Sequence, residues 1–330
     1  MVTRSAALSP RIQHAIDDLG YTRRRAPYAT GRTRQADTVA LVMTDIEHSL
    51  FTSIFEGAQE VCEDHGLQLI AMNAMSTQER QSEQVRHLCR MRVSGILLSS
   101  VFDSGKDIAT ATKAGVPLVM IDHENPVGTT TACTIVENNV AAGQMAAAEL
   151  LACGRRKLMF LGHSEHDFQA IRDRWEGASR YIAQQSVDRT GGIPEITNVD
   201  SQGIMIEDGY AMGRVIAAMP ANARPDGVIA ATDFLAVGLV NALMDDARVS
   251  VPDDIAVIGM EGDRLDAVGS MPLTVVQAPG DDMGRQAMHR LLEEMEAPRS
   301  HAHATISIMP KLVRRATTPS GGGTDAGQLT

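Results

Sequence analysis

The chain has 330 residues, of which 44% are hydrophobic and 22% charged, and its formal net charge is −11. This length and apolar content suffice for two domain cores of ordinary size. No apolar run is long enough to cross a membrane, and no apolar signal region follows Met1, so we expect a cytoplasmic protein. The four cysteines show no CxxC spacing, which argues against a disulfide framework or a zinc ribbon.

The first residues of the chain predict a short amphipathic helix followed by a basic connector. Ser9 can cap a helix whose first residue is Pro10, and Gly20 is placed to end it. Residues 1–35 contain seven arginines against two aspartates, a charge of +5, which leaves −16 for the rest of the chain. A basic arm on an acidic body is typical of a protein whose arm meets phosphates.

From Asp37 onward, buried strands alternate with amphipathic helices. We predict strands at 38–46, 67–74, 94–100, 116–122, 157–162, 195–199, 227–232 and 255–260. We predict helices at 51–65, 78–90, 104–114, 138–153, 168–185, 207–219 and 233–246. Because strand–helix–strand units of this size imply parallel pairing, the fold class is α/β, with two doubly wound parallel-sheet lobes. The Gly-rich residues 319–330 are expected to form a disordered tail.

Polar residues follow many of these strands. Ligands bind beyond the carboxyl ends of the strands in such sheets, so a polar cleft between the two halves is expected. The residues concerned are the segment TDIEH ending at His48, then Ser99, Ser100, Asp122, His123, Thr232, Asp233 and Glu261.

Segments spread over residues 8–318 resemble, in order and spacing, the bacterial regulators of the lactose-repressor (LacI/GalR) family. They include VALVMTDIEHSLFTSIFEGAQEVCEDHG, VSGILLSS, AGVPLVMID, NNVAAGQMAAAELLACGRRKLMFLG, RDRWEGA, EDGYAMG, GVIAATDFLAVGLVNAL, VPDDIAVIGMEGD and KLVRR. The resemblance implies a homodimeric transcription regulator with a DNA headpiece, a hinge and an effector-binding core of the periplasmic-binding-protein type. The helix at 138–153 has a face of small residues that can approach a neighbouring subunit closely or can equally pack on its own sheet: Ala141, Ala142, Met145, Ala146 and Ala148.

The resemblance also implies domain boundaries. The headpiece and hinge would occupy residues 1–36. The N-terminal lobe would take 37–155 with 280–298, and the C-terminal lobe 156–279 with 299–318. The chain would then cross between lobes near Cys153–Lys157, Val276–Pro279 and Arg299–Thr305.

The family's residue roles carry over unevenly. Arg174 matches an arginine that holds polar effector groups, and Phe51 matches an aromatic effector neighbour. Glu261 stands where the family usually has aspartate. His48, Ser99, Asp122, His123 and Asp233 occupy other expected effector-binding positions. Because aromatic residues make up only 3% of the chain, stacking on a sugar or purine face has little support, and we expect a small polar effector such as a carbohydrate.

The headpiece departs from the family pattern. MVTRSAA is too short for the two helices of a helix-turn-helix that would precede Ser9, so a start codon placed too far downstream is one interpretation. Pro27 would interrupt a hinge helix, and the wedging leucine is absent, leaving Tyr28 or Pro27 as the apolar wedge. The candidate DNA contacts are Arg4, Ser9, Arg11, Arg23, Arg24, Arg25 and Tyr28. The alternative function is a ligand-binding module that has lost specific DNA binding.

No pattern indicates catalysis or a cofactor. The chain lacks a GxGxxG turn after a strand and a GxxxxGK[ST] loop, and GHSEH at 162–166 lacks the final glycine of a nucleophile elbow. The pairs His163/His166 and His301/His303 have no thiol or acidic ligand at a fixed spacing, so we expect no metal site. The sequence therefore predicts a regulator rather than an enzyme.

Overall fold

The computed structural model describes residues 37–319 apart from 45, 47, 76, 124–130, 163–167, 186–192, 247 and 263–270. The chain divides into a unit of residues 1–36 and a unit of residues 37–330, and the described residues belong to the second. The headpiece, its candidate DNA contacts from Arg4 to Tyr28, the pair His163/His166 and the tail at 320–330 lie outside the described residues.

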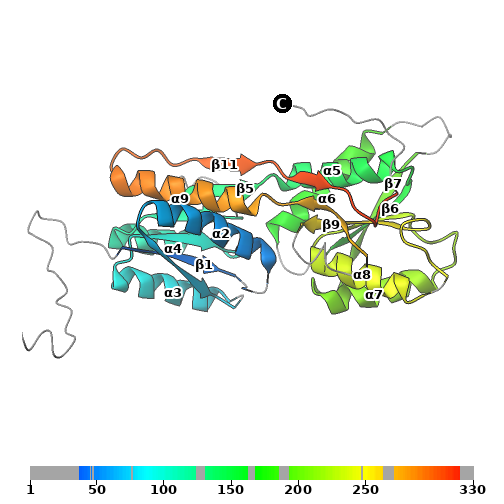
Figure 1. Ribbon diagram of the computed structural model, residues 1–330, viewed down its shortest axis with the longest axis horizontal. Helices are drawn as coiled ribbons and strands as arrows, with labels where there is room; N and C mark the ends of the chain where they lie inside the picture. Colours follow the sequence, from blue (N-terminus) through cyan, green and yellow to red (C-terminus); the bar gives the residue numbers. More distant parts are fainter. Residues whose placement is uncertain are drawn as a thin grey trace, which may run out of the picture. The chain divides into compact units, whose positions relative to one another are not determined.

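The first lobe is a parallel sheet between two helical layers (Figure 1). Its strands, in spatial order, are β11 (Thr305–Ile308), β5 (Cys133–Glu137), β4 (Leu118–Ile121), β3 (Gly95–Ser99), β1 (Thr38–Met43) and β2 (Gln68–Asn73). The helices are α2 (Ser49–Asp64) and α9 (Gly280–Glu296) on one face, with α3 (Gln78–Met91) and α4 (Gly105–Ala114) on the other. Alternate residues of β1 enter the two cores, which explains why this strand is apolar throughout.

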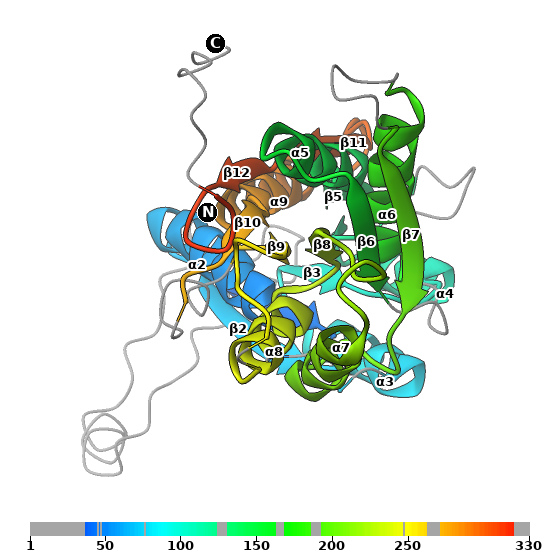
Figure 2. The ribbon, with the colours of Figure 1, turned by 90° about the vertical axis from the view of Figure 1, so that its right-hand side faces the viewer.

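The second lobe repeats the plan (Figure 2). Its strands, in spatial order, are β12 (Lys311–Val313), β10 (Thr274–Gln277), β9 (Ala256–Glu261), β8 (Gly227–Ala230), β6 (Lys157–Gly162) and β7 (Glu195–Asp200). Its helices are α5 (Asn139–Ala152), α6 (Gln169–Ala183), α7 (Ile206–Ala218) and α8 (Asp233–Met244). The strand pairs are parallel except β10 with β12. The expected pair of doubly wound lobes is confirmed.

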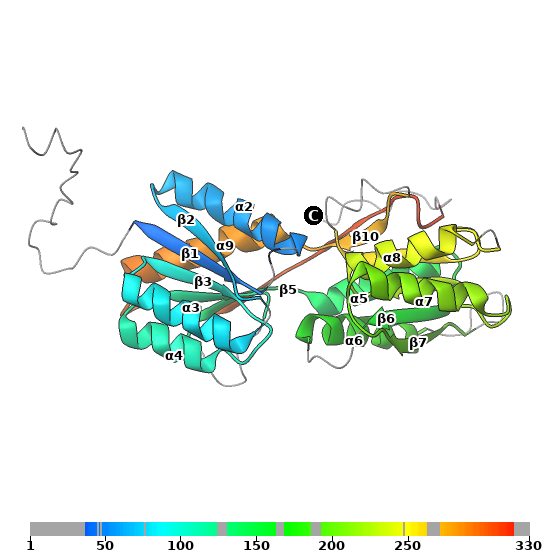
Figure 3. The same ribbon diagram turned by 90° about the horizontal axis from the view of Figure 1, so that it is seen from below.

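Within the described residues, the chain crosses between the lobes at three places (Figure 3). They are Asn138, between β5 and α5; Ala278–Pro279, between β10 and α9; and Met309–Pro310, between β11 and β12. The second lies within the expected segment Val276–Pro279.

The other two expected crossings were wrong. Residues 139–155 belong to the second lobe rather than the first, because α5 packs on α6 and on the core around β6. The segment leading into β11 belongs to the first lobe, because β11 pairs with β5. The alanine-rich helix is covered for the same reason: Ala142 and Ala146 are fully buried in their own lobe's core.

Helices α5 and α6 approach each other through two glycines. A Cβ atom on Gly143 would lie 1.9 Å from the carbonyl oxygen of Arg174, and one on Gly177 would lie 1.9 Å from that of Val140. Because glycine has no side chain, α6 can lie directly against α5 at these two positions. This close contact fixes the helix turn that carries Arg174.

Candidate functional site

A cavity of about 130 Å³ lies between the two lobes. The first lobe lines it with Thr44, His48, Phe51, Val101, Asp122 and His123. The second lobe lines it with Phe168, Gln169, Ala170, Ile171, Arg174, Ile204, Met205, Thr232, Phe234 and Glu261. Several of these residues follow the carboxyl ends of β1, β4, β8 and β9, where doubly wound sheets bind ligands.

Arg174 on α6 is the largest fully buried side chain of the described residues, at 1% exposure. Its Nε donates to Asn139 Oδ1 at 2.7 Å, and its Nη1 donates to the carbonyl of Ala231 at 2.8 Å and to Glu261 Oε1 at 2.9 Å. Its Nη2 donates to Glu137 Oε2 at 2.9 Å. Four of the five guanidinium N–H groups are therefore used within the protein.

These contacts join the two lobes electrostatically. Glu137 ends β5 of the first lobe, so its ion pair with Arg174 crosses between the lobes. His48, which precedes α2 of the first lobe, places Nε2 3.1 Å from Oε2 of Glu261, at the end of β9 in the second lobe. The chain Glu137, Arg174, Glu261, His48 thus contains two ion pairs between lobes.

The charges of these four side chains shift one another's pKa values. Burial alone would raise the pKa of Glu261, but the charges of His48 and Arg174 and their hydrogen bonds lower it to about 2. Burial would lower the pKa of His48, yet the adjacent Glu261 carboxylate raises it above its ordinary value. Burial raises the pKa of Glu137 despite the opposing charge of Arg174. The ion pair therefore shifts the pKa of both His48 and Glu261 in the direction that favours their charged forms.

Asp122 and Glu261 have a left-handed backbone, with φ of 61° and 101°. Non-glycine residues seldom adopt such angles, and the strain of about 1–3 kcal/mol each is commonly stored at functional sites. Burial raises the pKa of Asp122 to about 7, with Arg174 opposing the shift. The two strained residues come from different lobes and line the same cavity.

Four buried polar atoms around the site have no hydrogen-bond partner among the described residues: Thr44 Oγ1, His48 Nδ1, Asp122 Oδ1 and Glu137 Oε1. Each unpaired buried polar group costs about 1–3 kcal/mol. A ligand that supplied both donors and acceptors would remove part of this cost. Thr44, His48 and Asp122 all belong to the first lobe and line the cavity.

Three of the six phenylalanines of the chain line the cavity: Phe51, Phe168 and Phe234. The His48 ring lies 5.5 Å from that of Phe51 and 5.8 Å from that of Phe234, between centroids. The expectation of few aromatic neighbours was wrong, because the scarce aromatic residues are concentrated here. The cavity therefore offers apolar ring faces beside its charged groups.

Six of the eight expected effector residues line this cavity: His48, Phe51, Asp122, His123, Arg174 and Glu261. The remaining two do not. Ser99 is buried at the end of β3, and Asp233 is buried in the first turn of α8, where the neighbouring Thr232 caps the helix by accepting from Leu235 N. The role of all eight in binding stays a prediction.

The sequence reasoning missed several residues of the site. Glu137 and Asn139 bind Arg174, and Phe168 and Phe234 supply aromatic walls. A carboxylate closing the apolar run CTIVE was the available signal for Glu137, since an acidic residue that ends a buried strand needs a partner. Arg174 and Glu261 were both expected to bind the effector, and in the structure they bind each other.

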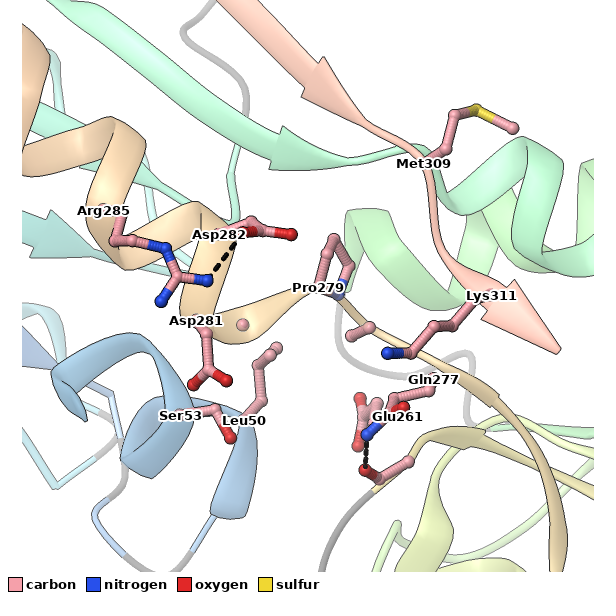
Figure 4. Close-up of a pocket in the computed structure, with 13 residues that line it drawn as sticks. Leu50, Ser53, Glu261, Gln277, Pro279, Asp281, Asp282, Arg285, Met309 and Lys311 are labelled. Carbon is pink, nitrogen blue, oxygen red and sulfur yellow. Dashed lines mark hydrogen bonds and ion pairs between the residues drawn. The ribbon is translucent and has the colours of Figure 1, made fainter. Parts of the chain in front are cut away.

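A second cavity of about 230 Å³ lies beside the crossing from β10 to α9 (Figure 4). Leu50 and Ser53 of α2 and Asp281 of α9 line one side, and Gln277 and Lys311 line the other. Glu261 borders this cavity as well as the first one. The two cavities therefore share the Glu261 side chain.

No helix among the described residues is long and apolar enough to span a membrane.

Two parallel-sheet lobes with a polar and aromatic cavity between them define a two-lobed ligand-binding protein. Residues 147–318 match the model of the periplasmic binding protein-like domain. The chain belongs to this family.

Two similar proteins are repressors by name. The chain is 27% identical to the HTH-type transcriptional repressor PurR of Photobacterium profundum, covering 94% of this chain and 89% of that protein. It is 25% identical to the ribose operon repressor of Escherichia coli, covering 95% and 91%.

Two solved structures share the fold. A LacI family transcriptional regulator from Enterococcus faecium with bound ribose has a TM-score of 0.72 at 19% identity, covering 85% of this chain and 98% of that one. The transcriptional regulator CelR in complex with cellobiose has a TM-score of 0.71 at 22% identity, covering 95% and 92%. The expected resemblance to the LacI/GalR regulators is confirmed.

Proposed function

We propose that this protein is an effector-responsive, DNA-binding transcription regulator, a repressor whose core binds a small neutral ligand rich in hydroxyl groups. The relatives named as repressors match along almost the whole chain, which supports a regulator over an enzyme. The similar solved structures hold ribose or cellobiose, which supports a sugar-like effector. No cofactor is part of the proposal.

The observation that carries the proposal is the buried chain of ion pairs that joins the lobes at the cavity. Arg174 contacts Glu137 of the first lobe while also contacting Glu261 of its own lobe. A ligand entering here contacts groups from both lobes, so its affinity depends on how the lobes are arranged. Such differential affinity is what allows a ligand to shift a conformational equilibrium.

The charge balance of the cavity favours a neutral ligand. The positive charges of Arg174 and protonated His48 are matched by the carboxylates of Glu137 and Glu261. Asp122, with a pKa of about 7, adds a partial negative charge at neutral pH. Because no positive charge is in excess, a phosphate or carboxylate would be repelled, whereas hydroxyl groups can pair with the unpaired oxygens and with His48 Nδ1.

Binding of ligands to the full chain tests the proposal. We expect thermal-shift screening to find stabilisation by a pentose, a disaccharide such as cellobiose or a nucleoside, and no stabilisation by ribose 5-phosphate. Calorimetry of the best ligand should show affinity several-fold weaker for Arg174→Ala and for Glu261→Gln. Glu60→Gln is the matched control, because Glu60 pairs with Arg285 on the exposed surface. Unchanged affinity in both site variants would refute the site.

The DNA-binding half of the proposal needs a separate measurement. Duplexes resembling operators and random duplexes are titrated at several salt concentrations, with and without the ligand. A regulator shows a sequence preference that survives moderate salt, because base contacts add to phosphate contacts. If all binding is weak and independent of sequence, the alternative holds, and the chain is a ligand-binding module without specific DNA binding.

We also infer that the core forms a homodimer, as the resemblance to the regulators implies. Sedimentation of a core starting at Gln35 measures this directly. A monomer at micromolar concentration contradicts the inference.

A further inference from the structure

A thiol and two imidazoles meet at the edge of the first lobe, outside both cavities. Cys133 Sγ lies 3.1 Å from His301 Nε2 and 3.9 Å from His303 Nδ1. One ligand atom from each of the three residues lies within 4.8 Å of the other two. Cys133 is fully buried, and both histidines are partly buried. Neither the proposed function nor the cavity between the lobes uses this cluster.

The pairing of β11 with β5 brings these residues together from distant parts of the chain. Thr305 is in register with Thr134, and Thr134 N donates to the carbonyl of Ala304 at 3.0 Å. Cys133 begins β5, so it faces the segment just before β11. His301 and His303 are two residues apart there, and their burial alternates with that of exposed Ala302 and Ala304. Both imidazoles therefore lie on the side of the thiol.

The spacing fits a tetrahedral metal ion. With metal–sulfur and metal–nitrogen bonds of about 2.3 and 2.05 Å, sulfur and nitrogen ligands of one tetrahedron lie about 3.6 Å apart. The two observed Sγ to nitrogen distances, 3.1 and 3.9 Å, lie on either side of this value. Small side-chain movements would make both equal, without any change in the register of the strands.

The surroundings favour a cation. His301 Nδ1, the nitrogen turned away from Cys133, lies 3.9 Å from Glu293 Oε2. A carboxylate behind a ligating histidine fixes the ring orientation and raises its basicity. Glu294 has a buried Oε2 with no partner among the described residues, and its charge acts on Cys133. Arg290 is the nearby positive charge, and it is paired with Glu293 at 2.7 Å.

We propose that Cys133, His301 and His303 bind a divalent transition-metal ion of the zinc type, with a fourth position for water or Glu294. One thiolate and two imidazoles are ligands that zinc prefers over magnesium or calcium. On binding, the thiol releases its proton, and the metal then joins the start of β5 to the segment between α9 and β11. The ion therefore tightens the attachment of β11, the edge strand of the first sheet.

This site is separate from the cavity between the lobes. Cys133 and Glu137 are the two ends of β5, about 13 Å apart along a five-residue strand. Because Glu137 contacts Arg174 at one end and Cys133 contacts the histidines at the other, metal and effector bind at opposite ends of the same strand. Metal binding therefore requires no effector, and its test does not depend on the proposed function.

Titration of the untagged, chelator-treated full chain with Co²⁺ tests the proposal, followed by displacement with Zn²⁺. We expect one equivalent of cobalt to give a thiolate-to-metal absorption band with the intense visible bands of tetrahedral Co²⁺, and zinc to abolish both and raise the Tm. Cys133→Ser should lose the thiolate band, and His303→Gln should weaken cobalt binding at least tenfold. His303 is partly exposed, so its variant is expected to fold even if Cys133→Ser does not.

Cys153→Ser and His289→Gln are matched controls, since Cys153 directly follows α5 in the second lobe and His289 is exposed on α9. Both should bind cobalt like the unaltered chain. The absence of a stoichiometric thiolate band, equal binding by His303→Gln, or loss of the band in Cys153→Ser would each overturn the proposal.

Discussion

Replacing Arg174 with methionine should destabilise the second lobe strongly and in a manner that depends on pH. Methionine keeps an unbranched apolar stem of similar length to that of arginine but removes the guanidinium, and with it four hydrogen bonds and the charge that faces Glu137 and Glu261. Glu261 keeps His48 as a partner, whereas Glu137 is left buried without an ion pair. Breaking a buried pair in this way costs about 3–5 kcal/mol, so we expect a loss of this size at pH 8.

The pH dependence follows from the carboxylate left behind. In the variant the pKa of Glu137 rises further, because the opposing charge is gone. Burying the Glu137 carboxyl therefore costs no ionisation free energy below its pKa in the unfolded chain. This cost grows as pH rises from that value towards the higher pKa of Glu137 in the folded protein. The loss in unfolding free energy should therefore be smaller at pH 5 than at pH 8. Adding Glu137→Gln should recover part of the loss at pH 8.

Urea unfolding measures these differences through the chain's single tryptophan. Trp175 follows Arg174 on α6 and packs on Phe160 with ring centroids 5.7 Å apart, so its fluorescence reports the second lobe. Arg180→Met is the control on the same helix: its exposed pair with Glu176 is worth at most about 0.5 kcal/mol. A loss below about 1 kcal/mol for Arg174→Met, or no change in that loss between pH 5 and pH 8, would refute the reasoning.

Three further outcomes are expected. Raising pH should open the lobes, because the ion pair of His48 with Glu261 is fully present below pH 6.5 and is lost as pH rises through the raised pKa of His48. Small-angle scattering should show an expansion of the protein with rising pH. The Asp122→Asn variant should still expand, and the Glu261→Gln variant should not. Gly143→Ala should cost about 1–3 kcal/mol or more in urea unfolding, because its Cβ would overlap a carbonyl oxygen of α6. Phe234→Ala should weaken sugar binding about tenfold by calorimetry, through loss of a ring face worth about 0.5–1.5 kcal/mol beyond its buried area.

The sequence predicted the lobes because parallel strands covered on both faces are short, continuous apolar runs. Strand β6 was expected at 157–162 and is observed there, and α3 and α8 differ from their expected ranges by no more than two residues at either end. Strands β5, β10, β11 and β12 and helix α9 were not predicted, and the partners with which these strands pair are what identifies them. The crossings were misplaced for the same reason, since they depend on sheet membership.

The part of the candidate site that was predicted consists of residues at the carboxyl ends of parallel strands, where ligands bind in such sheets. That rule finds Asp122 and Glu261, which directly follow or end apolar strands. The rule on strand ends cannot show that Arg174 binds two carboxylates from different lobes, since this pairing depends on how the two lobes come together. The pair His301/His303 was expected to lack a thiol, because Cys133 lies 168 residues away and only the register of β11 on β5 brings it near.

The distribution of paired and unpaired groups determines which ligands can control the lobes. The unpaired polar atoms that line the cavity come from Thr44, His48 and Asp122, all in the first lobe. The guanidinium of Arg174 already holds a carboxylate from each lobe. A ligand that only formed hydrogen bonds to the first lobe would bind the open and closed arrangements equally and would shift nothing. Contact with Phe234 of the second lobe supplies the difference, so an effector needs both hydroxyl groups and an apolar face. A sugar ring has both, and a compact polyol without such a face should bind without changing DNA affinity.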